Sequence, residues 1–162
     1  MSIRYIQALS KEDATKFLRG NHALSRPLTQ RFQGRIAWIG IDDYGHSPVA
    51  EVKTPHLVLR FIDAPDDTYT EAIQPEHAQN IVEFVRRIEK SRDPWALLVH
   101  CYAGVSRSGA VAEWVEEKYA PLPRVMFDEL HSHCLPNQYV LRLLNEYDLS
   151  SGSGLRGPNE AG

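Results

Sequence analysis

The stretch WALLVHCYAGVSRSGAVAEWV, residues 95–115, joins a continuous apolar run to a loop rich in glycine and serine and then to a second apolar segment. Residues 95–100 form the kind of uninterrupted apolar run that is expected of a central strand covered on both faces. Residues 108–119 predict a helix that begins near residues 106–108. We therefore expect a strand, a tight loop and a helix, with Cys101, Gly104 and Arg107 in the loop.

Further strands and helices are predicted on both sides of this unit. The expected strands are residues 3–9, 35–41 and 56–62, and the expected helices are residues 10–20, 75–88, 123–134 and 136–147. Residues 21–34 are polar around Pro27 and predict an irregular segment. Strands interleaved with helices early in the chain, followed by a helical C-terminal third, indicate an α/β fold with a short, mainly parallel central sheet flanked by helices.

The length and composition predict one domain. A chain of 162 residues with 43% hydrophobic content can bury a single sizeable core. We assign residues 1–150 to this domain and residues 151–162, SGSGLRGPNEAG, to a flexible tail. Three glutamates of the predicted helix, Glu113, Glu116 and Glu117, are expected on its solvated face.

The charge balance argues against some classes of partner. The chain has 18 lysines and arginines against 21 aspartates and glutamates, a formal net charge of −3, so we expect no nucleic-acid partner and no anionic membrane surface. The N-terminus has no basic-then-apolar leader pattern, and no apolar run approaches the ~20 residues that span a bilayer. Two cysteines are too few for a disulfide scaffold and fit a reducing compartment, so we expect a cytoplasmic protein.

The loop after residue 100 has the residue types that activate a cysteine. A cysteine is a nucleophile only as the thiolate, which converging backbone N–H groups and a helix N-terminus stabilise. The same arrangement binds phosphate. Gly104 allows a positive φ or a close backbone approach, and the planar fork of Arg107 can take two oxygens of a tetrahedral anion. The spacing of Cys101 and Arg107 alone is a weak signal, and the strand-loop-helix context strengthens it.

The segment HCYAGVSRS, residues 100–108, resembles the HCxxGxxR[ST] loop of the cysteine-dependent protein tyrosine phosphatase superfamily at every defined position. It is most similar to the dual-specificity branch, whose loops often read HCxAGxSRS. The resemblance implies a phosphatase-type phosphate-binding loop between a central strand and a helix. It extends over about residues 56–147, and residues 1–55 carry no motif that can be matched.

The resemblance implies a cysteinyl-phosphate mechanism without a cofactor. Cys101 would attack phosphorus, Arg107 would hold the transferring group, and Ser108 would help the thiolate leave in the second step. His100 would support Cys101 from behind without acting as the base. The residues expected to bind phosphate are Tyr102, Ala103, Gly104, Val105, Ser106 and Arg107.

The family also uses an aspartate on a loop upstream of the cysteine as general acid. Three aspartates, Asp63, Asp66 and Asp67, lie in the loop that follows the predicted strand at residues 56–62. The segment LRFID resembles the strand-then-aspartate pattern of the dual-specificity enzymes and favours Asp63. The distance along the chain favours Asp66 or Asp67, so these two remain alternatives.

Downstream, LPNQYVLRLL, residues 135–144, loosely resembles a helix start of the dual-specificity enzymes in which an asparagine supports the phosphate loop. The resemblance gives this supporting role to Asn137. The nearby group of His131, His133 and Cys134 could suggest a metal site, but the spacing does not place all three on one helical face. We therefore expect no metal, and a redox role for Cys134 stays open.

The sequence predicts a protein tyrosine or dual-specificity phosphatase that acts on a phosphorylated protein or peptide. The loop adds no cation to Arg107, which mildly favours a phosphoprotein over a lipid phosphate. Alternatives are a catalytically inactive phosphate-binding module and a phosphatase of a non-protein phosphomonoester. A sulfurtransferase or an arsenate reductase is disfavoured by the serines around Arg107 and by the mid-chain position of the loop. The sequence does not predict the oligomeric state.

Overall fold

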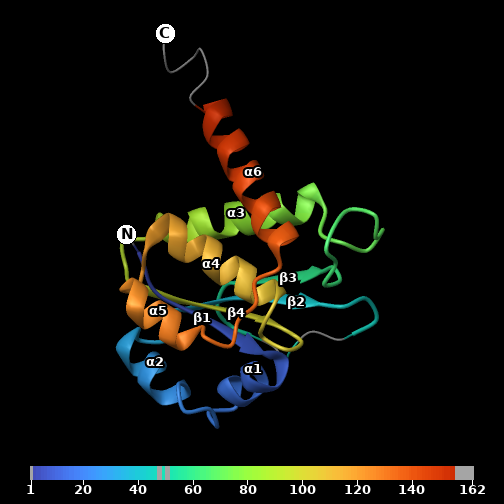
Figure 1. Ribbon diagram of the computed structural model, residues 1–162. Coiled ribbons are helices and arrows are strands. Elements are labelled where there is room, and N and C mark those ends of the chain that lie inside the picture. Colours follow the sequence, from blue (N-terminus) through green and yellow to red (C-terminus); the bar gives the residue numbers. More distant parts are fainter. Residues whose placement is uncertain (1, 47–48, 50–51, 156–162) are drawn as a thin grey trace.

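A four-stranded parallel sheet forms the centre of the molecule in the computed structural model, which describes residues 2–46, 49 and 52–155 (Figure 1). The strand order is β1-β4-β2-β3, and all three pairings are parallel. The strands are β1 (Ile3–Ser10), β2 (Ile36–Asp42), β3 (His56–Arg60) and β4 (Trp95–Cys101). The predicted α/β fold with a parallel central sheet is confirmed, and β4 lies between β1 and β2.

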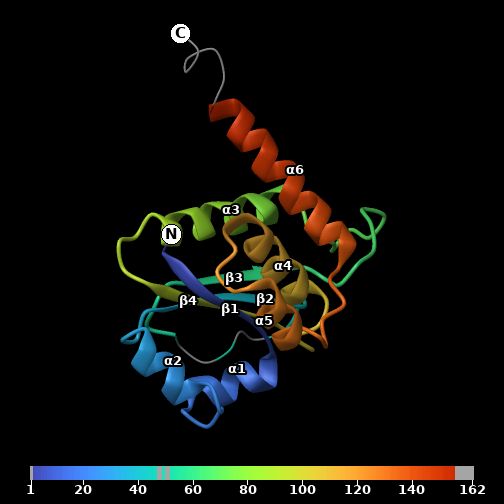
Figure 2. The ribbon, with the colours of Figure 1, turned by 60° about the vertical axis from the view of Figure 1, so that its left-hand side comes forward.

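Helices cover both faces of the sheet. The helices are α1 (Lys11–Leu18), α2 (Ser25–Arg31), α3 (Pro75–Glu89), α4 (Arg107–Tyr119), α5 (Arg124–Leu130) and α6 (Gln138–Leu155). Helices α3, α4 and α6 lie on one face, and α1 and α2 lie on the other (Figures 1 and 2). No described helix is long and apolar enough to cross a membrane.

The apolar periodicity of the chain explains this layering. Strands β2 and β4 are buried along nearly their whole length, because each has a neighbour on both sides and helices on both faces. Helix α3 starts at Pro75, a residue preorganised for the first helical turn, and it buries a stripe at helical spacing. This stripe is Ala78, Ile81, Val82, Phe84, Val85 and Ile88.

The structure differs from the sequence prediction in three helices. Residues 25–31 form α2 where an irregular segment was predicted, because Pro27 is tolerated in a first turn and Leu28 packs into the core. Helix α5 ends at Leu130, earlier than expected, and residues 131–133 form a turn.

The third difference concerns the predicted tail. Helix α6 continues to Leu155, so residues 151–155 are helical and do not belong to a structureless tail. Helix propagation is cooperative, and serine and glycine weaken a helix without blocking it as proline does. The rest of the predicted tail, residues 156–162, lies outside the described residues.

Candidate active site

The candidate nucleophile lies at the carboxyl end of β4, directly before the loop that leads into α4. Cys101 is buried, with 2% of its surface exposed. Its Sγ is 3.1 Å from Ser108 Oγ and accepts a hydrogen bond from the backbone N–H of Gly104 at 3.3 Å. The loop therefore curls around the sulfur and places two hydrogen-bonding groups beside it.

The shape of this loop depends on the N-terminal part of the chain. Gly104 has a φ of +74°, and a Cβ at this position would lie 2.4 Å from the backbone nitrogen of Ser10. The carbonyl oxygen of Tyr102 accepts a hydrogen bond from the backbone N–H of Lys11 at 3.1 Å. The junction of β1 and α1 thus supports one side of the loop, which gives the N-terminal segment a role that no sequence motif indicated.

Arg107 opens α4 and is held by two segments far away in the sequence. The residue is only 5% exposed. Its Nη1 donates to Asp43 Oδ1 at 2.7 Å, just beyond β2, and to the carbonyl oxygen of Phe61 at 2.8 Å, just beyond β3. Its buried Nε has no partner among the described residues. The sequence around Asp43, DDYG, predicts a turn whose loop could lie at the rim of the site, but it does not predict the contact with Arg107.

Of the three candidate acids, the structure brings Asp63 to the phosphate loop. Asp63 Oδ1 accepts hydrogen bonds from Ser106 Oγ at 2.8 Å and from Asn137 Nδ2 at 2.6 Å. Asp66 instead accepts hydrogen bonds from the backbone N–H and the hydroxyl of Thr68, and these bonds lower the pKa of the Asp66 carboxyl. Asp67 is exposed in the same loop.

Asn137 joins the phosphate loop to the loop that carries Asp63. Its backbone N–H donates to the carbonyl oxygen of Ser106 at 3.0 Å, and its side-chain amide donates to the carbonyl oxygen of Ala64 at 2.9 Å. Its Oδ1 accepts from the backbone N–H of Val140 at 3.0 Å and so starts α6. Asn137 therefore contacts both loops.

His100 lies beneath the loop and is fully buried. Burial lowers the pKa of its imidazole from 6.5 to about 4, so the ring is neutral at pH 7. Neither ring nitrogen has a hydrogen-bond partner among the described residues. The ring packs across Gly40 of the neighbouring strand, where a Cβ would lie 2.6 Å from His100 Nε2, so β2 needs a glycine at this point.

Exposed apolar side chains surround the mouth of the loop. Tyr102 is 65% exposed, and its ring lies 6.5 Å from that of His46 in an edge-on arrangement. Leu135 is 77% exposed, and its backbone N–H donates to the carbonyl oxygen of Val105 at 3.2 Å.

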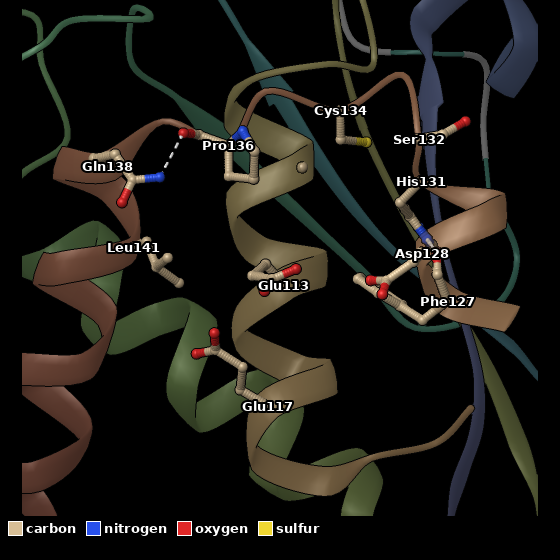
Figure 3. A pocket seen from close by; sticks show the side chains of 11 residues that line it. Glu113, Glu117, Phe127, Asp128, His131, Ser132, Cys134, Pro136, Gln138 and Leu141 are labelled. Carbon is tan, nitrogen blue, oxygen red and sulfur yellow. Dashed lines mark hydrogen bonds between the residues drawn. The ribbon is translucent and has the colours of Figure 1, made fainter. Parts of the chain in front are cut away.

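A hollow of about 520 Å³ lies between α4, α5 and the start of α6 (Figure 3). Glu113 and Glu117 project into it from α4, and Asp128 faces them from α5. Cys134 lies at the end of this hollow next to Gly109. Glu116, expected on the solvated face, is buried and accepts a hydrogen bond from the backbone N–H of Leu122.

His131 and Cys134, two members of the group of possible metal ligands, have other surroundings in the structure. No cluster of three or more potential metal ligands occurs in the part of the chain that the structure describes. His131 Nε2 accepts from the backbone N–H of Ala8 on the edge strand β1, so it serves the sheet edge. Burial, with the charges of Cys101 and Glu113, raises the pKa of the Cys134 thiol to about 11.

Comparisons with known proteins agree with this geometry. The family model described as protein-tyrosine phosphatase matches residues 67–114, which include the whole phosphate loop. The fold is similar to that of human DUSP28, with 14% sequence identity over 92% of this chain and 94% of that chain and a TM-score of 0.60.

Two further structures share this fold. Human tyrosine phosphatase-like serine/threonine/tyrosine-interacting protein has 23% identity over 80% of this chain and 85% of that chain, with a TM-score of 0.52. PTPMT1 in complex with PI(5)P has 13% identity over 94% of this chain and 95% of that chain, with a TM-score of 0.56. No curated protein matches the chain in sequence.

Proposed function

We propose that the chain is a member of the protein tyrosine phosphatase superfamily and a metal-independent phosphomonoesterase that acts on phosphorylated proteins; the family model that matches residues 67–114 supports this proposal. The observation that carries the proposal is the loop between β4 and α4. It buries Cys101 beside two hydrogen-bonding groups and brings Arg107 and Asp63 to the same loop. These are the groups needed for nucleophilic attack, binding of the phosphoryl group and protonation of the leaving oxygen.

In the first step, the Cys101 thiolate attacks phosphorus and forms a sulfur–phosphorus bond while the bond to the leaving oxygen breaks. The protonated carboxyl of Asp63 gives its proton to that oxygen. The fork of Arg107 and the backbone N–H groups of the loop bind the equatorial oxygens of the phosphoryl group, where negative charge is spread in the transition state.

In the second step, water attacks phosphorus and the bond to Cys101 breaks. The carboxylate of Asp63 takes a proton from the water, and inorganic phosphate leaves. Ser108 Oγ, 3.1 Å from the sulfur, donates a hydrogen bond to the departing thiolate and stabilises its charge. This role explains the need for a hydroxyl at the first turn of α4.

The substrate class follows from the charges around the loop. Arg107 is the one cation that residues 100–108 supply; Asp43 contacts its Nη1, and Asp63 contacts Ser106 of the same loop. A substrate with several phosphates would be repelled by these carboxylates, whereas one phosphate on a side chain of a protein would not. The structure of PTPMT1 with PI(5)P makes a lipid phosphate the alternative to test.

A second candidate function is a phosphate-binding module without turnover. The similar fold of a protein described as phosphatase-like and interacting favours this alternative. The presence of a cysteine, an arginine and a nearby aspartate in this chain favours the enzyme. The two cysteines and the charge balance also lead us to propose a reducing compartment such as the cytoplasm.

The deciding experiment measures hydrolysis of para-nitrophenyl phosphate in EDTA from pH 5 to 8, with the parent protein and Cys101→Ser. We expect turnover in the parent and none in the variant. Asp63→Asn should lower kcat by about 100-fold or more, whereas Asp66→Asn and Asp67→Asn should change it little. A folded parent that binds phosphate without turnover would instead establish the binding module. Phosphopeptides and PI(5)P vesicles then compare the substrate classes.

A further inference from the structure

The guanidinium of Arg107 has two edges with different surroundings. On one edge, Nη1 donates to a carboxylate oxygen of Asp43 at 2.7 Å and to the carbonyl oxygen of Phe61 at 2.8 Å. On the other edge, Nε is buried and has no partner among the described residues. An unpaired polar atom in a side chain that is only 5% exposed is costly, and it indicates a ligand that is yet to bind.

The free edge is the one that suits a tetrahedral anion. The N–H groups of Nε and Nη2 point the same way from the guanidinium plane and form the fork that takes two anion oxygens side by side. An arginine side chain can adopt many rotamers, and selecting one of them costs conformational entropy. Two acceptors on Nη1 fix the plane before the anion arrives and remove that cost from binding.

We propose that Asp43 is a positioning residue that holds Arg107 by its Nη1 edge, so that the Nε edge faces the phosphate. The proposal deepens the proposed function and rests on it for the identity of the reaction. Asp43 contacts the arginine and not the substrate, so its contribution is preorganisation of the phosphate-binding fork.

The neighbouring residue Asp42 has a different partner, so the contact with Arg107 is specific to Asp43. Asp42 ends β2, is buried, and pairs with the ammonium of Lys11 at 3.0 Å. Asp43 follows it outside the strand and is partly exposed, so its contact with Arg107 is made at the mouth of the loop. The segment after β2 therefore contributes to phosphate binding, although its sequence shows only a turn.

The test compares Asp43→Ala with Asp43→Asn, which keeps an oxygen acceptor for Nη1 but removes the charge. Glu71→Gln is the matched control, because Glu71 is an exposed carboxylate in the loop that follows β3. Each substitution is made in the parent and in Cys101→Ser. Tungstate, a tetrahedral oxyanion, is titrated by calorimetry into the Cys101→Ser proteins, and kcat and KM are measured in the others.

We expect Asp43→Ala to weaken tungstate binding by about 10- to 100-fold and to lower kcat/KM by a similar factor. Asp43→Asn should lie between Asp43→Ala and the parent, because the acceptor partly restores the geometry. Glu71→Gln should remain within about two-fold of the parent. A purely structural role would lower the melting temperature without changing the tungstate affinity of the folded protein.

Unchanged or tighter tungstate binding in both Asp43 variants would overturn the proposal, since a carboxylate that only repels or competes with the anion would give this result. If Asp43→Ala does not fold, Asp43→Asn decides the question. The proposed function fails separately: a parent that binds tungstate through an Asp43-dependent site but never hydrolyses a phosphomonoester would leave the role of Asp43 intact and remove the enzyme.

Discussion

The two sides of the phosphate loop differ in their chemistry. At the front, the Gly104 N–H and the Ser108 hydroxyl lie within hydrogen-bonding distance of Cys101 Sγ, and Arg107 opens α4. The back, between α4, α5 and α6, is lined by carboxylates and by Cys134 (Figure 3). Both sides contain one free cysteine, so the difference lies in what surrounds each sulfur.

This difference shows that the strand-loop-helix unit alone does not determine where an anion would bind, because the surrounding side chains differ on its two sides. Helix α4 contributes to both sides, with Arg107 and Ser108 at the front and Glu113 and Glu117 at the back. The N-terminal end of the helix favours negative charge, whereas about two to three turns later the side chains of Glu113 and Glu117 are acidic. We therefore expect a tetrahedral oxyanion to bind at the front and not at the back.

The largest expected effect is that of replacing Gly104. Gly109, on the other side of Arg107, serves as the comparison. Gly104→Ala places a methyl 2.4 Å from the Ser10 nitrogen at a φ of +74°, so it should destabilise the fold by about 2–4 kcal/mol. It should also lower kcat/KM by about 100-fold, because the loop must shift. Gly109→Ala meets Cys134 Cβ at 3.2 Å, and the gain in helix propensity offsets this contact to within about 1 kcal/mol. Denaturant melts and phosphatase assays compare the two variants. Equal losses of stability and of kcat/KM in both would contradict the expected difference between Gly104 and Gly109.

The second effect concerns the histidine beneath the front of the loop. The unfolded chain protonates His100 near pH 6.5, whereas the folded chain does so only at about pH 4. The unfolded state therefore binds more protons between these values, and the free energy of unfolding should fall by about 3 kcal/mol as the pH drops from 6.5 to 4.

Urea melts across this pH range measure the His100 effect. His100→Asn should flatten the pH dependence, while the exposed His133→Asn, beside the back hollow, should keep it. Part of the slope should survive in both variants, because burial also lowers the pKa of His56, His77 and His131. A slope that His100→Asn leaves unchanged would show that His100 is not the group responsible.

The third effect compares the two thiols directly. A pKa of about 11 leaves Cys134 almost entirely protonated at pH 7.5. Iodoacetamide should therefore alkylate Cys134 at least about 10-fold more slowly than it alkylates the thiol of free glutathione. Cys101 should be the site that reacts first, and tungstate should protect Cys101 but not Cys134. Peptide mass spectrometry over a time course follows both residues, and faster labelling of Cys134 would contradict the comparison.

The smallest expected effect concerns the glutamates in the hollow between α4, α5 and α6. The pKa of Glu117 is raised by burial and by the charge of Glu113, one helical turn away. Glu117→Gln should therefore stabilise the protein by about 0.5 kcal/mol at pH 7 by removing a like-charge pair. Its kcat/KM should stay within two-fold of the parent, because the substitution lies behind the loop. Thermal melts measure the stability and phosphatase assays measure kcat/KM. A large change in kcat/KM would show that Glu117 affects the site at Cys101.

Most of the fold could be predicted from local patterns. The strands at residues 36–42 and 95–101 and the helix that starts at Pro75 are strongly periodic or uniformly apolar, and the structure confirms them. Helix α2 was missed because it is short and contains a proline, and its formation depends on packing of Leu28. Glu116 was placed on the wrong face because the turn after α4 brings the Leu122 N–H to its carboxylate.

The sequence by itself determined which residues the proposed chemistry at Cys101 would use, because the cysteine, the glycine, the arginine and the serine are neighbours in one short segment. Only the tertiary structure decided what that segment touches. It brought Asp63 to the loop, set Asp66 against Thr68, paired Asp43 with Arg107 and placed the Ser10 backbone against Gly104. These contacts join the ends of strands that are far apart in the chain, and a parallel sheet gathers such ends at one edge without leaving a signal in the local sequence.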